Sequence, residues 1–456
     1  MHPATPVSWP DCGSGTEATS PSRWTLPRDG GPGRPRIPRS RTVPILDTLL
    51  THPAAVALTD SARTSLGFFW KSGWAFVLGY GISGMIQAFV PRSRLVRFMG
   101  GANPRSVALS TVFGAVSSSC SFAALAAARS LVAKGAHFVA AVAFMFASTN
   151  LVIELGILIF LFLGWQFVAA EVVGGLLLIG ISTLLIRATY PASWLEAARE
   201  KVEKEAPEQD EDFDWKERLT SLDGWQRVGN NFVGEWKMVW EEITIGFTVA
   251  GLVAVLVPAE VWSTIFLTDM QDTLPAWLIA VENAVVGPFV AAATFIGSMG
   301  NIPLATVLNA NGVLFAGLMG FIYSDLMVPP LVAVNAKYYG WRVALYIAGV
   351  MFVSIVVTAL ALHFGFGALG IVPESGRAVE EVVRFAVDYT FWLNLLMAAA
   401  AGGLVWLHRR HRAAHGGSGG HDHGSDPDGP SPKRLFVYLA LVVVGLGLVV
   451  TGLRLL

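Results

Sequence analysis

Long apolar runs follow one another through most of the chain. A helix needs about 20 apolar residues to cross roughly 30 Å of hydrocarbon. Runs of that kind predict membrane-spanning helices at 66–90, 137–163, 167–188, 239–260, 313–336, 342–365, 385–407 and 435–453. Two further segments, 107–134 and 286–310, are long enough but are interrupted by small and polar residues at their centres. The pattern predicts an all-α polytopic membrane protein.

Changes in composition divide the chain into seven parts. The N-terminal tail is rich in Pro, Gly, Ser and Arg and has no apolar stretch of a signal peptide, so we expect disorder or a wrongly assigned start codon. The predicted parts are the tail (1–60), a first membrane repeat (61–190), a charged cytoplasmic loop (191–236), a second membrane repeat (237–368), an additional transmembrane helix (369–407), a His/Gly-rich linker (408–434) and a C-terminal transmembrane helix (435–456).

The two halves share a pattern more than they share letters. Each has an apolar arm, a small-polar break at 117–121 or 297–303, a second arm ending in a glycine turn, and a long apolar helix with one polar cluster. Paired interruptions at corresponding places are typical of internally repeated transporters, whose binding site lies at the breaks. Chance similarity between apolar helices is the alternative.

The distribution of Lys and Arg bears on whether 107–134 and 286–310 cross the membrane. If all ten segments cross, 13 of these residues beyond residue 65 lie inside and 11 outside; if the two broken segments are re-entrant hairpins, the counts become 21 and 3. The positive-inside rule favours the hairpins, which would also make the two repeats inverted. Full crossing stays open.

Composition narrows the functional classes. Only 14% of the 456 residues are charged, against roughly 25% in an average soluble domain, and the mean hydropathy is +0.55. The formal charge of −1 and the absence of a basic domain argue against nucleic-acid binding. Two cysteines cannot make a disulfide framework. We therefore expect the lipid bilayer and a small solute as partners, and no nucleic acid or cofactor.

The first break is a candidate lining of the solute path. Its residues Ser117, Ser118, Ser119, Cys120 and Ser121 offer four hydroxyls, one thiol and a helix N-terminus. Helix N-termini attract anions. The thiol is a soft ligand suited to Cu(I), Hg(II) or trivalent arsenic. A small residue at a close helix contact is the alternative for Cys120.

Two acids stand out within the predicted spans. A carboxylate at the membrane centre is costly and is usually functional or paired, so Glu154 and Asp325 are the candidate coupling residues. Asn150 and Glu154, four positions apart, would share one helix face and could handle a proton or cation together. The structural alternative is an acid that pairs with Arg129 and holds helices together.

Other polar residues complete the predicted path, and some are assigned elsewhere. Glu171 and Glu282 lie nearer the predicted span ends, where we expect contact with interfacial solvent. The predicted path residues beyond the first break are Thr149, Asn150, Asn301 and Asn335.

The linker histidines form a weak candidate metal site. Imidazole suits Zn, Cu and Ni, but the spacing is irregular and the surroundings are Gly-rich, so a solvated linker is the alternative. The histidines are His408, His411, His415, His421 and His423.

These motifs resemble those of the ArsP-like bacterial permeases, a family of predicted permeases of which some export trivalent organoarsenicals. The matching stretches are 119–121, 134–135 and 146–150 in the first half and 300–303 and 324–329 in the second, within roughly 66–365. The resemblance implies a multi-pass permease of the bacterial inner membrane with its breaks near the translocation path. Members commonly carry paired cysteines at the break, where this chain has only Cys120.

The leading functional hypothesis is a secondary transporter for a small solute, with a metal, metalloid or organoarsenical among the candidates. No nucleotide-binding loop occurs, so coupling would be to protons or another ion gradient. The alternatives are a non-transporting membrane scaffold or assembly factor, and an intramembrane enzyme. Recognised catalytic motifs are absent from the sequence, so we expect no enzymatic activity.

Overall fold

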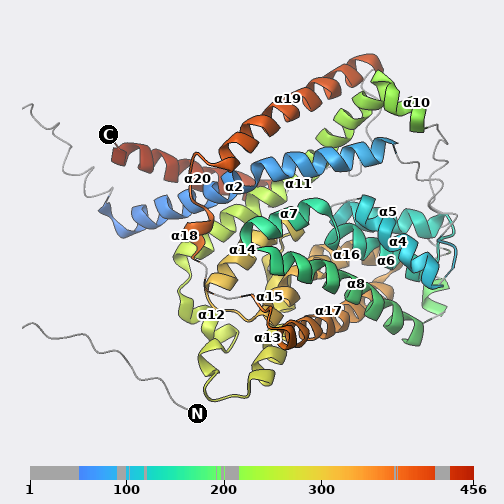
Figure 1. Ribbon diagram of the computed structural model, residues 1–456, viewed down its shortest axis with the longest axis horizontal. Helices are drawn as coiled ribbons and strands as arrows, with labels where there is room; N and C mark the ends of the chain where they lie inside the picture. The colour runs from blue at the N-terminus through green and yellow to red at the C-terminus, as the bar shows by residue number, and fades with distance from the viewer. Residues whose placement is uncertain are drawn as a thin grey trace, which may run out of the picture. The chain divides into compact units, whose positions relative to one another are not determined.

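The computed structural model describes residues 51–89, 99–101, 103–117, 121–189, 191, 193–196, 200, 215–373, 376, 378–415 and 432–455 (Figure 1). Helices joined by turns make up this part of the chain, without a β-strand. The predicted all-α architecture is therefore confirmed. Most of the predicted tail lies outside the described residues, and the first described helix begins at Pro53.

The first half contains one long helix followed by five shorter ones. In chain order they are α2 (Pro53–Phe89), α4 (Pro104–Ser117), α5 (Ser121–Ala133), α6 (Phe138–Asn150), α7 (Ile153–Phe162) and α8 (Trp165–Thr189).

The second half has a similar order of elements. They are α10 (Trp215–Thr220), α11 (Leu222–Leu256), α12 (Ala259–Ile265), η1 (Thr268–Met270), α13 (Ala276–Thr294), α14 (Ser298–Ala310), α15 (Phe315–Ile322), η2 (Tyr323–Met327), α16 (Pro329–Tyr339) and α17 (Trp341–Leu369). The chain ends with α18 (Val379–Val382), α19 (Tyr389–His415) and α20 (Pro432–Leu455).

Glycines in the left-handed region mark corresponding points of the two halves. Gly135 (φ 96°) separates α5 from α6, and Gly312 (φ 80°) separates α14 from α15. Gly164 (φ 101°) precedes α8, and Gly340 (φ 86°) precedes α17; each is followed by a tryptophan that begins the helix. Glycine adopts this conformation without steric cost. The two halves thus share this order of glycines, and the predicted repeat and its inversion both stay predictions.

Seven helices of the described part are long and apolar enough to cross a membrane, or eight when α6 and α7, bent by 41°, count as one span. Seven of the eight predicted runs lie in these spans. The run 66–90 lies in α2, which is not among them, and α13 is an additional candidate. At 1.5 Å per residue, the 14 residues of α4 and the 13 of α5 each rise about 20 Å, which is about two thirds of the hydrocarbon thickness and enough to pass the bilayer midplane. The chain is a multi-pass membrane protein.

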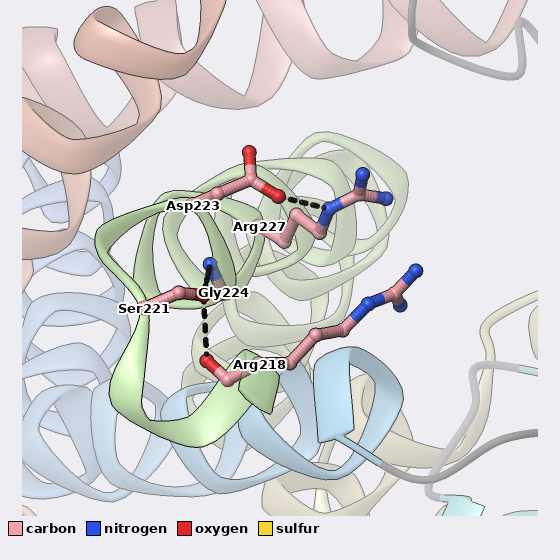
Figure 2. Close-up of polar contacts among 5 residues, drawn as sticks. All are labelled: Arg218, Ser221, Asp223, Gly224 and Arg227. Carbon is pink, nitrogen blue, oxygen red and sulfur yellow. Dashed lines mark hydrogen bonds and ion pairs between the residues drawn. The ribbon is translucent and has the colours of Figure 1, made fainter. Parts of the chain in front are cut away.

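The start of α11 is fixed by a side-chain cap (Figure 2). The hydroxyl of Ser221 accepts from the amide of Gly224 at 3.1 Å and donates to the carbonyl of Arg218 at 3.0 Å. Arg227 pairs with Asp223 one turn away, at 2.9 Å. Gly224 has no alternative here, because a Cβ would lie 1.9 Å from the Arg218 carbonyl oxygen. The cap satisfies one of the amides that a helix N-terminus leaves unpaired.

The long helices α2 and α11 pack against each other (Figure 1). Small residues allow a close approach: a Cβ on Gly251 of α11 would lie 2.7 Å from the Ser61 carbonyl oxygen of α2. Phe68 of α2 meets Phe162 of α7 and Phe247 of α11 edge to face, with ring centroids 5.5 and 6.2 Å apart. In a bilayer the hydrophobic effect does not drive helices together, so close packing at small residues such as Gly251 contributes to their association.

Candidate functional site

The first break meets the second half at a buried hydrogen bond. Ser121, the first residue of α5, donates from Oγ to Oδ2 of Asp325 in η2 at 2.8 Å, across 204 positions of sequence. Asp325 has no exposed surface, and only 2% of Ser121 is exposed. Sequence patterning identifies both residues independently, and the structure brings them together. Ser118, Ser119 and Cys120 lie outside the described residues, and Ser117 ends α4 in a half-buried position.

Asp325 is held by a short 3-10 segment between two helices. Pro329 begins α16 and Val328 is extended, so the helical hydrogen-bond ladder is interrupted at this point. The hydroxyl of Tyr323 donates to the carbonyls of Ala170 (2.9 Å) and Glu171 (3.2 Å) on α8. These contacts anchor η2, and with it Asp325, on α8.

Glu171 belongs to the same buried region. It is 2% exposed, and neither of its carboxylate oxygens has a hydrogen-bond partner in the described structure. Its charge interacts with that of Asp325. The expectation that Glu171 meets interfacial solvent is therefore wrong. The sequence does contain a sign that Glu171 is buried. Gly174 and Gly175, one turn further along α8, both lie against neighbouring side chains in the protein interior, and such small residues are typical of a packed helix face.

Glu154 is buried at a different contact. It lies in the first turn of α7 with 3% exposure, and a Cβ on Gly79 of α2 would come within 2.3 Å of the Glu154 Cβ. Asn150 is the last residue of α6, and the chain bends between the two helices. The expected shared face of Asn150 and Glu154 on one helix is thus wrong, because the helix ends between them.

The predicted polar residues of the first cluster bind mainly to their own helix. Asn150 donates to the carbonyl of Phe146 and to the hydroxyl of Thr149, both at 3.1 Å. Thr149 donates to the carbonyls of Met145 (3.3 Å) and Phe146 (3.2 Å). The Asn150 Oδ1 atom is buried and has no partner in the described structure. This cluster stabilises the end of α6 and leaves one acceptor unused.

The side chain of Asn301 makes hydrogen bonds across the second break. Its Nδ2 donates to the carbonyl of Ile296 at 3.1 Å, and its Oδ1 accepts from the hydroxyl of Thr294 at 3.2 Å. Phe295 has a left-handed backbone (φ 55°) between these partners. Asn301 therefore stabilises the break itself. Across it lies Glu242 of α11, whose Oε2 would be 2.4 Å from a Cβ on Gly297.

Two further predicted residues lie on or beside α16. Asn335 is buried, and its Oδ1 has no partner among the described residues. Arg129 of α5, the expected partner for the acids, lies over the ring of Tyr338 at 4.6 Å from its centroid. This contact joins the second arm of the first half to α16.

Three of the five predicted linker histidines lie in the described part of the chain. His408, His411 and His415 lie on α19, which continues to His415, whereas His421 and His423 lie outside the described residues. His408 Nδ1 is 3.1 Å from Asn230 Oδ1 of α11. Within the described part of the chain no group of three or more His, Cys, Asp or Glu residues could hold a metal ion.

Comparison with known proteins agrees with this architecture. The model of a family described as "Predicted permease", ArsP_1, matches residues 58–364. The chain is 38% identical over 328 residues to the "Putative permease Rv2963" of Mycobacterium tuberculosis, covering 69% of this chain and 79% of that protein.

A second relative is the "UPF0718 protein YraQ" of Escherichia coli, 28% identical over 230 residues. That match covers 50% of this chain and 60% of the relative. No solved structure matches the chain. The family match spans α4 to α16 and thus both breaks and the Ser121–Asp325 contact. The chain belongs to the ArsP_1 family of predicted permeases.

Proposed function

We propose that this permease is a secondary transporter of the bacterial inner membrane that moves a small solute along a path where its two halves meet. The observation that carries the proposal is the buried hydrogen bond from Ser121 to Asp325. It joins the first break of one half to the interrupted helix of the other. Within a bilayer, irregular backbone is tolerated where it is buried in protein or lines a water-filled cavity.

The breaks supply the groups that a solute site needs. The N-terminus of α5 begins at Ser121, and Asp325 sits beside it with Oδ1 unused among the described residues. Asn150 and Asn335 each hold one further buried acceptor without a partner there. Alternating access would move one half against the other at this junction, as in other transporters built from repeats.

Coupling is proposed to run through Glu154 and Asp325. Both are buried acids next to a helix interruption, and each belongs to a different half. We expect Glu154→Gln and Asp325→Asn each to abolish solute flux into proteoliposomes without lowering the amount of protein in the membrane. Glu260→Gln, an exposed acid on α12, is the matched control. Full flux in both buried-acid variants would refute this assignment.

The substrate class is tested through the one cysteine of the first break. Cells that express the protein and cells that lack it are grown with metal salts, arsenite and a trivalent methylarsenical, alongside a Cys120→Ser variant. A resistance phenotype that disappears in this variant supports a thiophilic solute, because a thiolate binds soft metals and arsenic. A phenotype indifferent to Cys120 shifts the proposal to a polar organic solute.

A further inference from the structure

Two buried carboxyl groups from different halves of the protein interact electrostatically inside the bundle. Glu171 lies on α8 of the first half, and Asp325 lies in η2 of the second. Both are almost completely buried, and their charges interact. The hydroxyl of Tyr323 binds the carbonyls of Ala170 and Glu171 and so holds the two segments together.

The hydrogen bonding of the two groups is unequal. Asp325 accepts at Oδ2 from Ser121, as an ionised carboxylate does, and its Oδ1 is unused in the described structure. Both oxygens of Glu171 are buried without a partner there. An ionised carboxylate without partners is very costly to bury, and two carboxylates that share a site cannot both be ionised cheaply. The arrangement therefore fits one carboxyl group and one carboxylate.

Among the residues that the structure describes, no cation is found among the charges that act on Glu171 or Asp325. The charge of Asp325 acts on Glu171, that of Glu242 on α11 acts on Asp325, and that of Glu171 acts on the neighbouring Tyr323. Glu242 also adjoins the second break at Gly297. The described residues contain no set of three or more ligands for a metal ion. A proton is thus the neutralising species that this site can accommodate.

We propose that Glu171 and Asp325 share one proton, and that this pair is the proton-binding site of the transport cycle. The role in the transport cycle rests on the proposed function, whereas the shared proton does not. Release breaks the O–H bond of the carboxyl group, passes the proton to water and takes the pair from a charge of −1 to −2. Reprotonation from water restores the buried, less charged state. Glu171 is in this way the partner of Asp325 across the two halves.

The proton is measured directly by infrared spectroscopy of the purified full chain in nanodiscs. The titration runs from about pH 5 to about pH 9, a range in which exposed carboxyl groups are already ionised for most of the steps. We expect the wild type to show the carbonyl stretch of a buried protonated carboxyl group, lost on titration. Glu171→Gln removes this band, and Asp325→Asn shifts the pH at which it disappears, because the neighbouring charge is gone.

Three controls accompany the titration: a variant of an exposed acid, a test of folding and a change of the monovalent cation. Glu260→Gln leaves the band unchanged, and size-exclusion profiles show that each variant is folded. A band that persists in Glu171→Gln overturns the proposal. A band that falls at constant pH when choline chloride is replaced by sodium chloride overturns it in favour of a monovalent cation site.

The transport part of the proposal has its own readout. In proteoliposomes that carry a solute identified by the growth screen, Glu171→Gln is expected to remove the dependence of flux on an imposed pH gradient. Unchanged gradient dependence in this variant overturns the coupling role even when transport itself is established. The infrared result stands apart from flux, so failure of the transporter proposal and failure of the proton pair are distinguishable.

Discussion

Replacement of Gly174 by alanine tests how the buried acids are positioned. Gly174 lies on α8 opposite Tyr323, whose hydroxyl holds η2 through the carbonyls of Ala170 and Glu171. A Cβ at this position would lie 2.2 Å from the Tyr323 hydroxyl oxygen and 2.5 Å from Cδ1 of Leu362. The leucine methyl can rotate away, but the hydroxyl can move only by giving up its hydrogen bonds.

The expected cost follows from these contacts. Overpacking of a core costs about 1–3 kcal/mol, and alanine regains about 1 kcal/mol of helix propensity relative to glycine. Loss of the Tyr323 hydrogen bonds adds about 1 kcal/mol. We therefore expect Gly174→Ala to lower the free energy of unfolding by about 1–3 kcal/mol. In a Tyr323→Phe background the hydroxyl oxygen at 2.2 Å is absent. The nearest atom of residue 323 to the added Cβ is then the ring carbon Cζ, at 3.0 Å.

A double-mutant cycle isolates this contact. The free energy of unfolding is measured for the wild type, both single variants and the double variant by titrating mixed micelles with dodecyl sulfate. The double variant is expected to be more stable than the sum of the single effects by about 1 kcal/mol, as for residues in contact. Gly180→Ala on the same helix, with open space around it, is the control. Additive effects, or a neutral Gly174→Ala, would refute the reasoning.

Three further predictions concern other contacts. Ser121→Ala removes a hydrogen bond to Asp325 and is expected to cost about 1–3 kcal/mol of unfolding free energy in the same titration; an unchanged midpoint would contradict the contact. Gly246→Ala forces a Cβ to within 2.4 Å of the α14 backbone, so thermal unfolding should occur at a lower temperature, whereas Gly234→Ala, with free space, should be neutral. Ser221→Ala removes the α11 cap at about 1 kcal/mol, and faster hydrogen exchange confined to the first turn of α11 is the expected sign.

The sequence predicts most helices, and it singles out both residues of the central contact, for the same physical reason. Apolar runs long enough to span lipid are rare by chance, and polar residues within them are costly. Ser121 and Asp325 are conspicuous against that background, and they meet in the structure. Their contact is not itself a prediction of the sequence, because Asp325 lies in the polar cluster of its half and not at the second break.

Two errors have causes that a single sequence does not display. The bend between α6 and α7 has no Gly or Pro at 151–152; Leu151 instead fits against Gly175 of α8, where a Cβ would lie 2.6 Å from its Cδ2. The prediction for Glu171 uses its distance from the end of an apolar run. That distance gives depth along the helix axis but not the direction in which the side chain points, and α8 turns Glu171 toward the interior.

The position of α2 explains why it is less apolar than the candidate membrane spans. This helix packs against α11, α19 and α20, and its Lys71 donates to the Tyr389 hydroxyl at the start of α19 at 3.1 Å. By contrast, only 6% of the apolar stretch of α19 and 17% of that of α20 are buried. The two C-terminal helices therefore cover part of the surface of α2. We expect their own exposed apolar surfaces to contact lipid in its place. In a relative that lacked α19 and α20, the positions of α2 that these helices cover here would face lipid. We expect those positions to be more apolar in such a relative, so the composition of α2 depends on whether its neighbours are present.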